Sequence, residues 1–176
     1  MKAVFVTEFG GVEKLRYEEL PTPTVRAGQA LVKIKAIGVN FIDIYHRAGV
    51  YPVALPSGLG MEGAGVVTAV GAGAADIAVG DRVAYAGGPI EPVGAYAEAR
   101  NIPADRLVKL PAGIDFKTAA AMMLQGMTAQ YLLRRTYRVQ AGDTILIHAA
   151  AGGVGLIVCQ WAKALGATVI GTVGSD

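Results

Sequence analysis

The stretch that decides the fold is "DTILIHAAAGGVGLIVCQWAKALGATVIGTV", residues 143–173. It contains an apolar run, a glycine cluster, a helix-like segment that ends at Gly166, and a second apolar run. This order is that of a βαβ unit. Strands that are apolar throughout are typical of a parallel sheet covered on both faces. The stretch therefore predicts the first part of an α/β domain.

The glycine cluster has the spacing of a dinucleotide-binding turn. Such a turn needs a tight bend, a close backbone approach to pyrophosphate and a glycine where the helix packs on the strand. These three positions are Ala150, Gly152 and Gly155, with Gly153 and Val154 between the last two. The first glycine is replaced by alanine, which leaves the N–H groups of residues 152–155 to face phosphate. We expect all five residues to bind the cofactor; glycines that serve packing alone remain the alternative.

The end of the second apolar run predicts which nicotinamide cofactor binds. An acidic residue there would bond the ribose 2′-hydroxyl and select NAD. Residues 172–174 include no acid, and Asp176 comes one or two positions late. Gly174 and Ser175 leave room for a 2′-phosphate without negative charge. We therefore expect NADPH rather than NADH, with Gly174 and Ser175 beside it.

The remaining sequence is β-rich at first and helical later. Alternating runs at 1–6 and 30–39, with short β-rich runs punctuated by glycine such as 80–87, predict a small, irregular antiparallel barrel. One helix, "FIDIYHRAG", is expected to stop at Gly49. From residue 116 onward, "FKTAAAMMLQGMTAQYLLRRTYRV" predicts two helices with a break near Gly126. We place the boundary between a domain 1–124 and a second domain 125–176.

Composition limits the possible classes of protein. The 176 residues are 53% hydrophobic and 17% charged with net charge +2, which predicts a folded protein and gives no electrostatic reason to expect nucleic acid or a membrane as partner. Cys159 is the only cysteine, so neither an internal disulfide nor a cysteine zinc cage can form. With no signal-peptide pattern and no bilayer-spanning stretch, a cytoplasmic location is expected.

Five stretches together resemble one known family. They are "AIGVNFIDIYHRAGVYP", "LPSGLGMEGAGVV", "GDRVAY", "GAYAEARNIPADRLVKLP" and "HAAAGGVGLIVCQWAKALGATVIGTVGS". In this order they resemble the medium-chain dehydrogenase/reductase superfamily, in particular its zinc-free, zeta-crystallin-like NADPH:quinone oxidoreductase branch. The resemblance implies an α/β protein in which a GroES-like catalytic barrel precedes a Rossmann domain with a doubly wound parallel sheet. Family members are longer, so an amino-terminal portion is implied.

The resemblance also predicts that no metal is bound. Zinc-dependent relatives carry cysteine, histidine and cysteine where this sequence has Asn40, Met61 and Gln125. Two amides and a thioether do not replace two thiolates and an imidazole around Zn²⁺. His46 and His148 lack a third partner. We therefore expect zinc-independent hydride transfer to a quinone or a conjugated carbonyl compound, and alcohol oxidation is disfavoured.

The resemblance assigns the remaining site residues. Asn40, Tyr45 and Tyr51 are the expected catalytic residues, because the family's corresponding helix faces the nicotinamide and the substrate. The expected cofactor contacts outside the glycine turn are Phe41, Ile42, Asp43, Gln125 and Thr128. Asp43 has two alternatives, to cap its own helix or to pair with Arg47, and Tyr51 could simply pack its turn.

The sequence thus predicts an NADPH-dependent quinone reductase, and a homodimer in its full-length form. An enoyl or alkenal double-bond reductase is the alternative enzyme, and a nucleotide- or RNA-binding protein without turnover is the non-enzymatic alternative. A tyrosine or water could supply the proton. The isolated 1–176 polypeptide is expected to be poorly soluble or partly molten, without quinone reductase activity. The full-length parent is expected to be active and insensitive to chelators.

Overall fold

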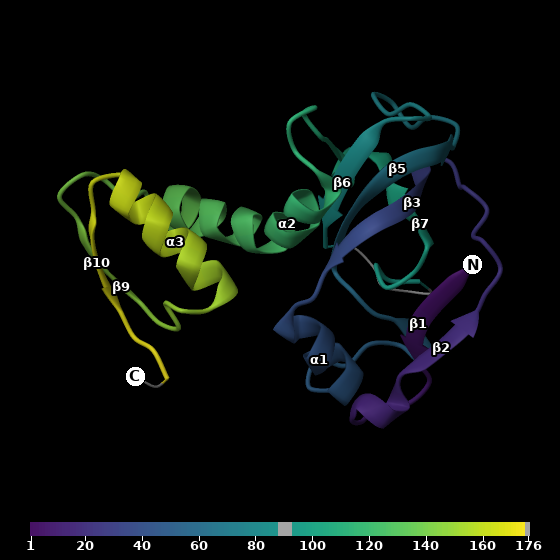
Figure 1. Cartoon of the computed structure of the whole chain (residues 1–176), viewed down its shortest axis with the longest axis horizontal. Helices are drawn as coiled ribbons and strands as arrows, with labels where there is room; N and C mark the ends of the chain where they lie inside the picture. The colour runs from purple at the N-terminus through teal and green to yellow at the C-terminus, as the bar shows by residue number, and fades with distance from the viewer. Residues whose placement is uncertain (88–92, 175–176) are drawn as a thin grey trace. The chain divides into compact units, whose positions relative to one another are not determined.

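A computed structural model describes residues 1–87 and 93–174 (Figure 1). Its internal contacts divide the chain into two compact units, Met1–Met123 and Leu124–Asp176, which are described separately below.

The first unit is built on a five-stranded antiparallel sheet with the order β7-β3-β5-β6-β8. Its strands are β3 (Gln29–Gly38), β5 (Glu62–Val70), β6 (Arg82–Ala86), β7 (Ala99–Pro103) and β8 (Val108–Lys109). Two register shifts interrupt the β3–β5 pairing. Such irregularities bend a strand and let a sheet curl around a core.

A second, smaller sheet completes this unit in the order β2-β1-β4. Its strands are β1 (Lys2–Val6), β2 (Arg16–Glu19) and β4 (Ser57–Gly58), and short 3-10 turns occur at Val12–Lys14 and Ala104–Arg106. The main core gathers alternate residues of the five-stranded sheet, which the alternating sequence pattern predicts, together with Ala95 from the segment before β7. These buried residues are Ala30, Val32, Val67, Val83, Tyr85, Ala95 and Ile102.

Helix α1 (Phe41–Ala48) follows β3 directly. Asn40 and Asp43 form a capping box at its start, and the helix ends at Gly49, whose φ of 76° is in the left-handed region that glycine adopts without strain. The predicted helix and its glycine stop are both confirmed. α1 thus places residues 40–48 immediately beside the end of a core strand.

The predicted helix break near Gly126 is wrong. Helix α2 runs without interruption over Phe116–Tyr131, and a π-helical turn, η3 (Leu132–Thr136), follows it. A single interior glycine costs a helix only about 1 kcal/mol relative to alanine, and strong helix-forming residues surround Gly126. The irregularity lies instead at the carboxyl end of α2.

The second unit contains the predicted βαβ arrangement. Strands β9 (Thr144–Ile147) and β10 (Thr168–Gly171) pair in parallel, and helix α3 (Gly153–Ala164) connects them (Figure 1). Helix α3 packs against one face of the strand pair and against the end of α2. The buried residues of this core are Ala129, Leu133, Val139, Val158 and Ala162. The other face of the strand pair leaves Leu146 and Ile170 exposed.

Candidate functional site

The glycine turn joins β9 to α3, and Gly152 is the N-cap of the helix. The first intrahelical bond runs from the Leu156 N–H to the Gly152 carbonyl over 2.8 Å. The N–H groups of Gly153, Val154 and Gly155 therefore precede any helical acceptor, and such groups, together with the helix dipole, favour an anion. The N–H of Gly152 does not belong to this set, because it donates to the Ala149 carbonyl at 2.9 Å and so closes the turn. Contact of Gly152 with the cofactor stays a prediction.

Two positions in this turn have no room for a side chain. A Cβ on Gly155 would approach the carbonyl oxygens of Ala149 and Ala150, lying 2.7 Å from the latter. Neither atom can move without shifting the backbone, so Gly155 serves the close helix–turn packing expected of the third glycine. A Cβ on Gly153 would lie 2.5 Å from Cδ of Gln125. Gln125 is thus held against the first residue of α3.

Four more residues are predicted to bind the cofactor: Thr128, Ala150, Gly174 and Ser175. Thr128 uses its hydroxyl to donate to the Leu124 carbonyl of its own helix over 2.7 Å. Ala150 donates its N–H to the Thr172 carbonyl at 3.0 Å, which joins the turn to the end of β10. Among residues 1–87 and 93–174, no atom outside its chain neighbours lies within 4 Å of a Cβ built on Gly174. Ser175 lies outside the described residues.

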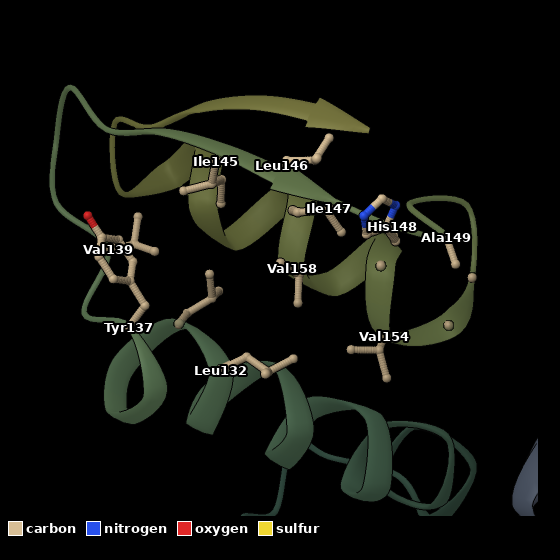
Figure 2. A pocket seen from close by; sticks show the side chains of 14 residues that line it. Leu132, Tyr137, Val139, Ile145, Leu146, Ile147, His148, Ala149, Val154 and Val158 are labelled. Carbon is tan, nitrogen blue, oxygen red and sulfur yellow. The ribbon is translucent and has the colours of Figure 1, made fainter. Parts of the chain in front are cut away.

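An apolar cavity of about 690 Å³ borders the glycine turn. Figure 2 shows Ile145 and Ile147 of β9, Val154 and Val158 of α3, and Leu132 of η3 around it. The polar members of its lining are the His148 ring, the Tyr137 side chain and the turn backbone at Gly152, Gly153 and Gly155. His148 also contacts Thr172, with 3.1 Å between Nδ1 and Oγ1. The cavity therefore combines an apolar wall with backbone at the start of α3.

In the first unit, Asn40 belongs to a chain of polar contacts at the start of α1. Its Nδ2 donates to Oε1 of Glu62 over 2.7 Å, and its backbone N–H donates to Oδ2 of Asp43 over 2.9 Å. The same Asp43 oxygen accepts the Tyr96 hydroxyl at 2.8 Å. Asp43 and Glu62 are only 4% and 1% exposed. We call Asn40, Asp43, Glu62 and Tyr96 the Asn40 network.

Burial shifts the pKa of two members of this network, Asp43 and Tyr96. It raises the pKa of the Asp43 carboxyl, while hydrogen bonds from the Asn40 backbone and Tyr96, and the nearby His46, act in the opposite direction. Burial also raises the pKa of the Tyr96 hydroxyl, and the negative charges of Asp43 and Glu62 raise it further. Tyr96 is therefore held as a hydrogen-bond donor.

The geometry decides between the two structural alternatives for Asp43. Asp43 caps its own helix through the capping box. No ion pair joins Asp43 to Arg47 among the described residues.

Tyr45 and Tyr51 form an aromatic pair beside this network. Their ring centroids are 5.3 Å apart at an interplanar angle of 70°, an edge-to-face arrangement. Both remain partly open to solvent, at 38% and 53% exposure, and Phe41 is 76% exposed. Ile42 is half-buried. The structure thus brings Tyr45 and Tyr51 together and presents an aromatic surface.

Sequence reasoning missed Glu62 and Tyr96. The available signal for Glu62 was an acid among glycines and apolar residues in "GLGMEGAGVV", which predicts a buried charge in a strand. No local pattern marks Tyr96, since its partner Asp43 lies 53 positions away in the sequence.

The described residues contain no group of three or more His, Cys, Asp or Glu side chains placed to hold one metal ion. Of the positions that correspond to zinc ligands, Asn40 and Met61 lie in the first unit and Gln125 lies in the second. No helix in the described ranges, 1–87 and 93–174, has the length and apolar character needed to cross a membrane.

Comparison with known proteins identifies the family. Residues 26–112 match the alcohol dehydrogenase GroES-like domain. The chain is 54% identical to a quinone oxidoreductase of Pseudomonas aeruginosa, an alignment that covers 99% of this chain and 53% of that protein. The chain belongs to the medium-chain dehydrogenase/reductase superfamily. The structure of an Escherichia coli quinone oxidoreductase complexed with NADPH, 50% identical, superposes with a TM-score of 0.95 and covers 100% of this chain and 53% of that one.

A third relative carries a different name. The chain is 45% identical to a 2-haloacrylate reductase of a Burkholderia species, over 99% of this chain and 53% of that protein. This chain of the medium-chain dehydrogenase/reductase superfamily thus spans about half the length of the curated relatives it matches. The expected fold class, a GroES-like domain followed by the beginning of a Rossmann domain, is confirmed.

Proposed function

We propose that the protein is an NADPH-dependent quinone oxidoreductase that works without zinc. The observation that carries the proposal is the glycine turn at the start of α3, which offers the N–H groups of Gly153, Val154 and Gly155 and excludes a side chain at Gly155. The relatives named quinone oxidoreductase support it.

The residues present fit a dinucleotide cofactor. The three N–H groups would bind the pyrophosphate, and Gln125, which lies against Gly153, would contact the cofactor next to it. No carboxylate occurs among residues 172–174 to repel a 2′-phosphate, and Gly174 leaves open space there. When bound, NADPH supplies the hydride.

The first unit would hold the acceptor of that hydride. Tyr45 and Tyr51 offer flat apolar surfaces of the kind on which a quinone ring stacks. Asn40, with its side chain bonded to Glu62, would orient a quinone oxygen or the cofactor carboxamide. Hydride transfer depends on the positions of two bound reactants, and these residues would provide position rather than acid–base chemistry.

The zinc-free assignment rests on the chemistry of Asn40, Met61 and Gln125, which offer amides and a thioether where zinc-dependent relatives offer thiolates and imidazole. We expect NADPH-dependent turnover in the native polypeptide that carries residues 1–176 to survive dialysis against a zinc chelator. Activity that is lost on dialysis and restored by zinc alone would contradict this assignment.

A double-bond reductase is the second candidate, because the similarity to a 2-haloacrylate reductase favours it. Both reactions need the same cofactor, so the acceptor distinguishes them. NADPH oxidation should be measured in the native polypeptide with 1,4-benzoquinone and with 2-alkenals. A higher kcat/KM for benzoquinone is the expected result. A higher value for the alkenal would favour the second candidate, and RNA retention at physiological salt without any turnover would favour a binding protein.

We further infer a domain boundary after residue 124, a small-molecule quinone or conjugated carbonyl substrate, a cytoplasmic location and a homodimer. The first is supported by the division of the chain into Met1–Met123 and Leu124–Asp176. The substrate class is supported by the names of the relatives. Gel filtration of the native polypeptide with light scattering tests the dimer.

A further inference from the structure

Glu62 is a buried carboxylate that contacts Asn40. The proposed function gives it no role of its own. It is the first residue of β5, it is 1% exposed, and its Oε1 accepts Nδ2 of Asn40. Transfer of a carboxylate from water into a protein core is costly unless hydrogen bonds compensate for it. A residue kept at such a position needs a structural or functional reason.

The partners of Asn40 distinguish the two ends of its amide. The carbonyl and NH₂ groups of an asparagine have nearly the same shape, so shape alone leaves two orientations open. An ionised carboxylate only accepts hydrogen bonds. An ionised Glu62 therefore permits one orientation of the Asn40 amide, with Nδ2 toward the carboxylate.

A glycine provides the space for this contact. Gly38, the last residue of β3, pairs with Glu62 across the sheet. A Cβ on Gly38 would lie 2.5 Å from Cδ of Glu62 and 2.6 Å from the carbonyl oxygen of Ala120. The backbone oxygen cannot move aside as a flexible side chain can. Any larger residue at position 38 would therefore displace the Glu62 carboxylate from Asn40.

The main chain of Asn40 is fixed as well as its side chain. Oδ2 of Asp43 accepts both the Asn40 N–H and the Tyr96 hydroxyl. The Tyr96 ring occupies space that a side chain at position 60 would fill. Gly60 has a φ of 94°, and a Cβ added to it would lie 2.8 Å from Cε1 of the ring. Gly38 and Gly60 thus leave room for Glu62 and Tyr96. Glu62 bonds the Asn40 side chain, and Tyr96 bonds the carboxylate that accepts the Asn40 N–H.

We propose that Glu62 is a positioning residue that fixes the amide orientation of Asn40. A quinone or carboxamide oxygen beside Asn40 then meets an N–H donor, whereas the flipped amide would present a carbonyl oxygen and repel it. This role rests on the proposed function, because it acts on a substrate or cofactor through Asn40. Glu62 itself needs no contact with either.

The test compares Glu62→Gln with Glu62→Asp in the native polypeptide that carries residues 1–176. Glutamine keeps the size but can donate as well as accept, so it permits both orientations of Asn40. Aspartate is shorter but accepts only. We expect kcat/KM for 1,4-benzoquinone to fall about tenfold or more in Glu62→Gln and less in Glu62→Asp. The opposite order would show that Glu62 fills space only and would overturn the proposal.

A double-mutant cycle shows whether Glu62 acts through Asn40. In an Asn40→Ala background, Glu62→Gln should reduce kcat/KM by less than about twofold, because no amide remains to be oriented. Full additivity of the two losses would contradict the positioning role. Glu18→Gln, the same change at an exposed residue of β2, is the matched control and should leave turnover unchanged.

A readout without turnover separates this inference from the proposed function. In the ¹⁵N-labelled native polypeptide that carries residues 1–176, the two side-chain amide protons of Asn40 should give one pair of NMR signals. The pair should shift or double in Glu62→Gln and stay in place in Glu18→Gln. Unchanged signals in Glu62→Gln would overturn the inference, whatever the activity. An inactive wild-type protein with this NMR result would refute only the quinone reductase.

Discussion

The Tyr96 hydroxyl and the Asn40 backbone N–H donate to one and the same carboxylate oxygen, Oδ2 of Asp43, over 2.8 and 2.9 Å. The carboxylate therefore joins the segment around Tyr96 to the first turn of α1. Because Asp43 is 4% exposed, water does not compete strongly for these bonds. Changes at Asp43 should affect the stability of the first unit, and they should also change how that stability depends on pH.

The first prediction concerns that pH dependence. Burial raises the folded-state pKa of Asp43 above the ordinary aspartate value of 3.8. A group with a raised folded-state pKa contributes stability that is complete below the unfolded-state pKa and is lost as the pH rises through the folded-state pKa. Asparagine resembles the protonated carboxyl and does not titrate. The stability of the wild type relative to Asp43→Asn should therefore fall as the pH rises from about 3.8.

Urea unfolding of both proteins between pH 4 and pH 7 measures this difference. Glu18→Gln, which changes an exposed side chain of β2, is the control and should show no such trend relative to the wild type. A wild-type advantage that grows with pH would mean that the folded-state pKa of Asp43 is lowered, contrary to the expectation.

The second prediction is that Gly155→Ala damages the glycine turn. The new Cβ would approach two backbone carbonyl oxygens, those of Ala149 and Ala150, and the backbone would have to shift. We expect a loss of about 1–3 kcal/mol in the free energy of unfolding and weaker NADPH binding. Denaturant unfolding and cofactor fluorescence titration measure the two effects. Gly113→Ala, where nothing lies within 4 Å of the added Cβ, should leave both unchanged.

Much of the geometry of the glycine turn can be predicted from the sequence, whereas that of the Asn40 network cannot. The turn lies within one βαβ unit, so its residues are close in the sequence and their spacing reports their geometry. The helix start at Gly153 and the close packing at Gly155 both agree with that spacing. The use of the Gly152 N–H within the turn could not be read from spacing, because it depends on the bend at Ala149, whose φ is 53°.

The Asn40 network depends instead on contacts between distant segments. Glu62 is 22 positions from Asn40, and Tyr96 is 53 positions from Asp43. Only the pairing of β3 with β5 brings the first two together. The predicted break in α2 failed for a related reason, because local propensity gave Gly126 more weight than its context does. The predicted roles of the site residues remain predictions.

The third prediction concerns cofactor choice. Gly174→Asp should reduce the preference for NADPH over NADH about tenfold or more, because a carboxylate there repels a 2′-phosphate and can accept the 2′-hydroxyl of NADH. The position has open space, so the change should not disturb folding. Dissociation constants for both cofactors measure the ratio. Gly174→Asn adds a side chain of the same shape without charge and should change it little; an equal effect of both variants would attribute the change to size.

The fourth prediction concerns the aromatic pair. Tyr51→Ala removes a half-exposed ring that packs edge-to-face against Tyr45. KM for 1,4-benzoquinone should then rise about fivefold. Tyr51→Phe keeps the ring and should stay within about twofold of the wild type. Tyr17→Ala, at an exposed ring of β2, should not change KM. If Tyr51→Phe lost as much as Tyr51→Ala, the hydroxyl rather than the ring would be responsible.

The fifth prediction concerns the polypeptide 1–176 by itself. The β9–β10 pair leaves Leu146 and Ile170 at 59% and 54% exposure on one face, and only two strands form this sheet within the described residues. Two strands give marginal independent stability. We expect the purified polypeptide to bind a hydrophobic dye and to show no NADPH-dependent quinone turnover. Robust turnover would show that these residues suffice for the reaction.

Gly38 and Gly60, which leave room for two side chains of the Asn40 network, should constrain how the sequence diverges. A side chain at position 38 needs both a shorter residue at position 62 and a shift of the backbone at Ala120. A side chain at position 60 needs both a smaller residue at position 96 and a backbone that tolerates a φ of 94°. Each pair should therefore change jointly during divergence, and single changes should be purged. Among homologous sequences, alanine or larger at position 38 should accompany a smaller residue at position 62, and lineages that lose the acid should be those in which the amide at position 40 has also been replaced.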